Sequence, residues 1–154
     1  MSMTMKNHLF KSQQWPAEQA QIIQRIRQGE QVKFTEHFAA SLQQRGVSVG
    51  EVYSIFKNGS AEIIQGHDRK TYAIQNGPLN QDEIRVFYGR TKANRIIHVV
   101  MALPQDGSLK FITAYFPTRV YFEVDFKTLK REWQFHHICE SQNSLAIPLK
   151  ERLQ

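Results

Sequence analysis

Histidine and arginine side chains at several points of the chain could together cleave a phosphodiester. His37 and His98 fall within predicted regular elements, and histidine exchanges protons near neutral pH. Arg45 stands at a predicted helix end, and the guanidinium fork matches phosphate oxygens. Metal-free RNA cleavage needs a base for the 2′-OH, a cation for the phosphorane charge and an acid for the leaving 5′ oxygen. These residue types could fill those three roles.

Other polar residues could hold and orient such a substrate. Tyr115 and Thr113 share a predicted strand, and several basic residues flank predicted loops. The catalytic candidates are His37, His98, Arg45 and Tyr115, and the substrate-binding candidates are Arg90, Thr113, Arg119 and Lys70.

Each candidate also has a structural interpretation. His37 could cap or pack against a helix. His98 shares a strand face with Ile96 and Val100, and a lone histidine on an apolar face is more often a hydrogen-bonded core residue. Arg45 could simply complement the negative end of a helix. The two strand candidates are also ordinary strand formers.

Composition narrows the class of protein. The 154 residues are 41% hydrophobic, which is enough for a core, and the net charge is +6. A basic balance favours nucleic acid, an anionic membrane surface or an acidic protein as partner. Cys139 is the only cysteine, so an internal disulfide and a multi-cysteine zinc site are excluded. We expect the protein to act in a cytoplasm, its own cell's or that of a cell into which it is delivered.

Neither a membrane segment nor a cofactor is expected. The apolar runs are of strand length, and the first residues lack the apolar stretch of a signal peptide. The carboxylates are scattered, so no metal site is predicted; His136 and His137 near Cys139 are the weak alternative. No glycine-rich nucleotide loop occurs.

Helix signals fill the first part of the chain. Pro16 suits the first turn of a helix that runs to residue 28. Thr35 is a cap for a helix over 35–44. Ser48 and Glu51 have capping-box spacing and predict a third helix that ends at Asn58.

Strand signals follow. Strands are predicted over 61–65, 70–75, 83–90, 95–103 and 109–116, with a further strand over 120–124 and a helix over 125–133. The short connections make the last three main strands an antiparallel meander. Apolar residues on both faces place strands 95–103 and 109–116 centrally in the sheet. Uninterrupted alternation puts Phe111, Thr113 and Tyr115 on one face of their strand.

These elements predict an α+β fold. N-terminal helices pack on an antiparallel sheet, and a C-terminal helix follows it. The predicted organisation is a flexible lead over 1–14, one domain over 15–133 and a C-terminal tail over 134–154.

The ordered motifs of residues 34–117 resemble a family of small bacterial domains of unassigned function. The matching pieces are His37, Arg45-Gly46-Val47-Ser48, Glu51-Val52, His98-Val99-Val100 and Ile112-Thr113-Ala114-Tyr115 with Pro117. That family is similar to the BrnT and RelE-like toxins and is grouped with the barnase, EndoU, colicin and RelE-like fold of metal-independent ribonucleases. Relatives often carry arginine where this chain has Ser41. If that arginine binds phosphate in them, the role is lost here or passes to Arg45, Arg69 or Lys70.

The resemblance implies a ribonuclease toxin that cleaves tRNA or mRNA without metal or cofactor in a host or target bacterial cell. Its implied partners are RNA and a cognate acidic antitoxin or immunity protein. Two alternatives stay open. One is a non-catalytic RNA- or protein-binding regulator on the same scaffold, and the other is a toxin with a different activity.

Overall fold

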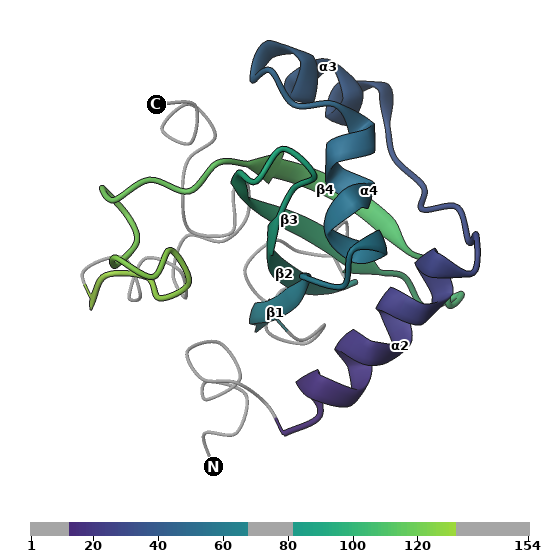
Figure 1. The fold of residues 1–154 in the computed structure, drawn as a ribbon. Helices are drawn as coiled ribbons and strands as arrows, with labels where there is room; N and C mark the ends of the chain where they lie inside the picture. The colour runs from purple at the N-terminus through teal and green to yellow at the C-terminus, as the bar shows by residue number, and fades with distance from the viewer. Residues whose placement is uncertain (1–12, 68–81, 132–154) are drawn as a thin grey trace.

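The structure is a computed structural model that describes residues 13–67 and 82–131 of the chain. Within these residues, three helices precede a four-stranded sheet whose order is β1-β2-β3-β4, with every neighbouring pair antiparallel (Figure 1). The elements are α2 (Trp15–Arg27), α3 (Glu36–Gln44), α4 (Val49–Lys57), β1 (Glu62–His67), β2 (Glu83–Arg90), β3 (Ile96–Leu103) and β4 (Lys110–Tyr115). The predicted α+β class and the meander are confirmed.

The helices begin where the sequence places their caps. The Thr35 side chain accepts a hydrogen bond from the Phe38 amide at 3.1 Å and starts α3. Ser48 and Glu51 form the predicted capping box at the start of α4. These side chains satisfy amides that the helices leave unpaired, so the helix starts are fixed locally.

The sheet separates two apolar clusters. On the helix side, Phe38 of α3 and Phe56 of α4 pack with Val99 and Met101 of β3. The opposite face of β3 carries Val100, which packs with aromatic residues of the segment that follows β4. The predicted alternation of β3 is thereby confirmed, and both of its faces are buried.

Strand β4 differs from the prediction in two ways. It is an edge strand of the described sheet, not a central one. A bulge also interrupts its register, because Val100 pairs with Thr113 while Met101 pairs with Phe111. Ile112 is the extra residue and is exposed. The predicted common face is therefore wrong: Phe111 joins the helix-side cluster, whereas the residues after the bulge are shifted by one.

The segment after β4 also departs from the prediction. Residues 124–128 form a turn and bends, and none of residues 125–130 is helical. The strand over 120–124 is reduced to a single bridge between Phe122 and Leu129. The Asp125 carboxylate accepts hydrogen bonds from the amides of Lys127 and Thr128, which folds the chain into a tight turn. Phe126 has φ 56°, which a right-handed helix excludes. The strand over 70–75, the tail over 134–154 and the histidines near Cys139 lie outside the described residues.

The approach of α4 to the sheet depends on Gly89 of β2. A Cβ atom at this position would lie 2.5 Å from Cβ and 2.7 Å from Cγ2 of Ile55, which is buried in α4. Neither element can yield locally, because the contact is with branched side-chain atoms close to the helix backbone. The position therefore requires glycine.

Gly89→Ala should lower the free energy of unfolding by about 1–3 kcal/mol, since it overpacks the contact between α4 and β2. Urea denaturation of the full chain measures this. Gly50→Ala is the matched control, because its Cβ would meet only the Ser48 hydroxyl at 3.7 Å. The control should be neutral or stabilising by up to about 1 kcal/mol. Equal stability of the two variants would contradict the close approach.

Candidate functional site

Four predicted site residues meet at the end of β4 and form what we call the Arg45 cluster: Arg45, His98, Thr113 and Tyr115. Nη1 of Arg45 donates to Oγ1 of Thr113 at 3.0 Å and to the carbonyl oxygen of Ala114. The hydroxyl of Tyr115 lies 3.4 Å from Nδ1 of His98. Residues that are 68 positions apart in the chain are thus in direct contact.

Arg45 reaches the edge strand because α3 ends there. It is the C-cap of α3, and Gly46 with φ 71° then reverses the chain toward α4. One turn earlier in α3, the buried Ser41 donates its hydroxyl to the Phe38 carbonyl at 2.8 Å. Of the residues to which the missing arginine's role could pass, Arg45 is the one within the described residues. Arg69 and Lys70 lie outside them.

The guanidinium of Arg45 is only partly satisfied. Its Nε and Nη2 atoms are buried and have no hydrogen-bond partner among the described residues. Burial lowers the pKa of Arg45, and the nearby Tyr115 opposes that effect in part. A buried cation with two unpaired donors is costly, and an anion would offset that cost. Because both nitrogens are buried, an anion reaches them only after a local rearrangement.

His98 is fully buried and is held by both ring nitrogens. Its Nε2 contacts the carbonyl oxygen of Phe126, which can only accept. We therefore assign the proton of the neutral ring to Nε2, so that Nδ1 accepts from the Tyr115 hydroxyl. The ring also meets Phe122 edge-on at 4.7 Å between centroids. This arrangement orders a chain of polar groups from Tyr115 to the Phe126 carbonyl.

The turn at Asp125 positions that carbonyl. Burial acts to raise the pKa of Asp125, but hydrogen bonds from Lys127 and Thr128 outweigh it and hold the pKa below its usual value. The Thr128 hydroxyl also donates to this carboxylate at 2.9 Å. The ionised form of Asp125 thus stabilises the turn that faces His98.

The structure does not bring the two predicted catalytic histidines together. His37 is exposed in the first turn of α3, on the helix side of the sheet. His98 lies on the opposite face, in register with Tyr115. Arg90 is exposed at the end of β2, and Arg119 is exposed beyond β4. Lys70 lies outside the described residues.

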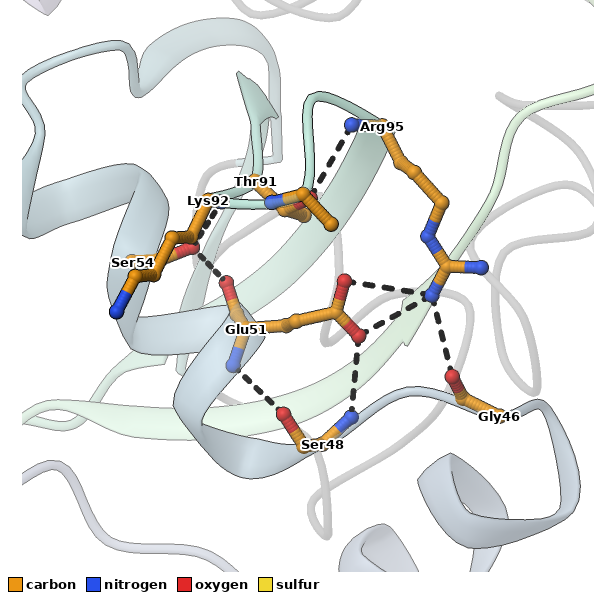
Figure 2. A network of polar contacts seen from close by, with 8 residues as sticks. Gly46, Ser48, Glu51, Ser54, Thr91, Lys92 and Arg95 are labelled. Atoms are coloured by element: carbon orange, nitrogen blue, oxygen red, sulfur yellow. Dashed lines mark hydrogen bonds and ion pairs between the residues drawn. The ribbon is translucent and has the colours of Figure 1, made fainter.

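A second polar network fixes the loop that carries Arg45 (Figure 2). Nη2 of Arg95 donates to the Glu51 carboxylate at 3.1 Å and to the Gly46 carbonyl at 3.1 Å. Figure 2 shows Glu51 at the centre of these contacts, between the hairpin and the start of α4. The Arg95 guanidinium also lies 4.1 Å from the Phe116 ring centroid. The network ties the β2–β3 hairpin to the turn that presents Arg45.

Sequence reasoning missed two parts of this site. The capping box is visible in the sequence, but nothing there indicates that Arg95 joins it. The Phe126 carbonyl is a backbone group and leaves no signal in residue type. Asp125 is the first residue of the helix predicted over 125–133, where it would serve as the cap, and the structure uses it to close a turn instead.

No group of histidine, cysteine, aspartate or glutamate residues that could hold a metal ion occurs within 13–67 and 82–131. Among the helices in these two ranges, none is long and apolar enough to cross a membrane.

Comparison with known proteins identifies one related family. A family model described as "Domain of unknown function (DUF4258)" matches residues 34–116, which is more than half of the chain. The match covers almost the same residues as the motifs that relate the sequence to a small domain of unassigned function. No curated protein and no solved structure matches the chain.

Asp125→Asn should make the protein less sensitive to acid. Because the folded pKa of Asp125 is lowered, its contribution to stability is full above its unfolded pKa of about 3.9 and is lost as the pH falls through the folded value. The free energy of unfolding of the variant should therefore fall less steeply between about pH 5 and pH 3 than that of the parent protein.

Urea denaturation at several pH values measures this slope. Glu123→Gln is the control, because the carboxylate of Glu123 accepts no hydrogen bond in the part of the chain that the structure describes. Equal slopes in Asp125→Asn and the parent protein would contradict the stabilising turn.

Proposed function

Since the chain belongs to the DUF4258 family, for which no function is assigned, we propose from its geometry that it is a metal-independent ribonuclease of the toxin type. Its substrate would be tRNA or mRNA in a host or target bacterial cell. The observation that carries the proposal is the Arg45 guanidinium, which has two unpaired buried donors beside the Tyr115–His98 pair.

The Arg45 cluster can supply two of the three catalytic functions. The Arg45 fork would bind non-bridging phosphate oxygens and stabilise the charge that develops on them. Tyr115 would accept the proton of the attacking 2′-OH while passing its own to Nδ1 of His98. The Phe126 carbonyl would then stabilise the imidazolium through its Nε2–H contact.

The bond changes balance without a cofactor. The 2′ oxygen forms a bond to phosphorus, the bond from phosphorus to the 5′ oxygen breaks, and a 2′,3′-cyclic phosphate results. The leaving 5′ oxygen takes its proton from water, and the hydroxide so formed recovers the proton of the His98 imidazolium through the Tyr115 hydroxyl, which restores the site. The described residues place no second histidine near this oxygen, and the acid role expected of His37 is therefore not part of the proposal.

Charge supports an RNA partner. The net charge is +6. Arg90 is exposed at the end of β2 and pairs with the start of β3, the end of the sheet at which His98 pairs with Tyr115, and Arg119 is exposed beyond β4. These cations would bind backbone phosphates and not bases, which suits a sequence-tolerant contact. A small acidic antitoxin or immunity protein would compete for the same surface.

A non-catalytic RNA-binding protein is the second candidate. It is favoured by the burial of His98, which is 0% exposed and engaged at both ring nitrogens. A histidine in that state also suits a purely structural network. In that case the RNA-binding cations would be retained and the chemistry absent.

Purified full-length protein should cleave total RNA in EDTA. Arg45→Gln should lower the rate by about 100- to 1,000-fold, because the phosphorane charge loses its main donor. Tyr115→Phe removes only the hydroxyl and should lower the rate by at least about 100-fold. His37→Ala is the control, and it should cleave at the parent rate because its side chain is exposed and outside the cluster.

Thermal unfolding of each variant separates lost chemistry from lost structure. Cleavage at the parent rate by folded Arg45→Gln and Tyr115→Phe would rule out the site. Intact RNA at high protein concentration, together with salt-dependent RNA binding, would select the non-catalytic candidate. If the protein neither cleaves nor binds RNA, both candidate functions are excluded.

A further inference from the structure

Ion pairing is uneven over the surface. Most described acidic side chains pair with a basic neighbour, as in Arg25–Glu30, Lys33–Asp106, Arg85–Glu18, Arg95–Glu51 and Lys127–Glu62. Arg27, Lys57 and Lys92 have no carboxylate partner among the described residues. These three cations come from α2, α4 and the β2–β3 hairpin, and their charge is left uncompensated.

The three cations line two adjoining hollows along α4. Lys57 and Lys92 border a hollow of about 390 Å³ together with Ser54 and Asn58. Lys57 also borders a second hollow of about 300 Å³ together with Arg27 and Glu30, and the Glu30 carboxylate is neutralised by its ion pair with Arg25. Because Lys57 belongs to both, the two hollows form one strip of positive charge.

Hydrogen bonds hold the backbone beneath this strip. The Lys92 amide donates to the Ser54 hydroxyl at 3.1 Å, and the Asn58 side chain donates to the Arg90 carbonyl at 2.8 Å. Figure 2 shows the Lys92 side chain extending along α4 past Ser54, away from Glu51 and Arg95. Fixed elements thus place both lysines on the border of the first hollow. Neither ammonium group meets a carboxylate of the described residues, and that of Lys57 lies 5.6 Å from the Tyr53 ring centroid.

We propose that Arg27, Lys57 and Lys92 form a second RNA contact that binds backbone phosphates of a single strand, apart from the Arg45 cluster. The inference rests on the proposed function in taking RNA as the partner. The Glu51–Arg95 ion pair lies between Lys92 and Gly46, the residue that follows Arg45 in the chain (Figure 2). A single RNA strand would be bound at the strip and cleaved at the Arg45 cluster.

The shape and chemistry of the strip favour a nucleic-acid backbone over an acidic protein. Its hollows are open to solvent, so an extended phosphate backbone can lie across them. The large exposed apolar residues are Phe34, Ile112, Val120 and Val124, and none of them borders either hollow. Tyr53 borders the second hollow, but its ring is half-buried and lies under the Lys57 ammonium. Protein interfaces usually have an apolar centre, whereas phosphate tracks need only spaced cations.

The test is the salt dependence of binding to a short, fluorescent, single-stranded RNA with 2′-O-methyl groups. This probe keeps every phosphate but lacks the 2′-OH that cleavage requires. The Lys57→Gln/Lys92→Gln double variant should lower the slope of log K against log salt by about 1.4 between about 50 and 200 mM, from about 0.7 per lost phosphate contact. Arg27→Gln should lower it further.

The Lys33→Gln/Lys110→Gln double variant is the matched control. It removes the same net charge near the start of β4, where Lys33 and Lys110 are bridge partners. It should leave the slope unchanged. If both double variants lose slope equally, or if neither loses any, the proposal that the strip binds RNA is wrong.

The strip and the proposed ribonuclease can fail separately. An unchanged slope in the Lys57→Gln/Lys92→Gln variant with cleavage intact would reject only the strip. A reduced slope without any cleavage by the parent protein would support the strip and reject the ribonuclease. Binding of polyglutamate as tight as that of the RNA probe would assign the strip to an acidic protein and overturn the inference.

Discussion

The packing of α4 on the sheet is the contact on which the rest of the molecule depends. Phe56 meets Phe87 at 5.0 Å and Phe111 at 6.1 Å between ring centroids, so one side chain joins α4 to both β2 and β4. Gly89 allows the helix backbone to come this close. With α4 held there, its first turn fixes the loop that presents Arg45, and its last turn borders the basic strip. Both surfaces that we assign to RNA therefore rest on the same apolar contact.

Much of the fold was predictable because its signals are local. Caps such as Thr35 and Ser48 act within one helical turn, and a pattern that repeats every two residues marks a strand such as β3. The predictions were wrong where contacts between distant residues, or competing local hydrogen bonds, determine the structure. The bulge at Ile112 depends on register with β3, which strand composition does not encode. Asp125 could cap a helix or close a turn, and the same hydrogen-bonding side chain suits both.

The candidate site was predictable in part. Arg45, Thr113 and Tyr115 were identified from ordered motifs, and the structure brings them into contact. The pairing of His98 with His37 was inferred from residue type, which carries no information about which face of the sheet each one occupies. The sequence placed His98 on an apolar face, and the structure shows why a polar ring is stable there. It finds partners in a tyrosine hydroxyl and a backbone carbonyl.

The bulge at Ile112 divides β4 into two halves that place their side chains in different surroundings. Before it, Phe111 belongs to the packing between sheet and helices; after it, Thr113 and Tyr115 belong to the polar cluster. If the same sequence alternated without a bulge, Tyr115 would share the face of Phe111 and point toward the helices. A single inserted position thus lets one short strand serve two environments. The first half is limited by the volume available to Phe111, whereas the second half combines hydrogen-bonding side chains at Thr113 and Tyr115 with a small residue, Ala114, that still packs toward the helices.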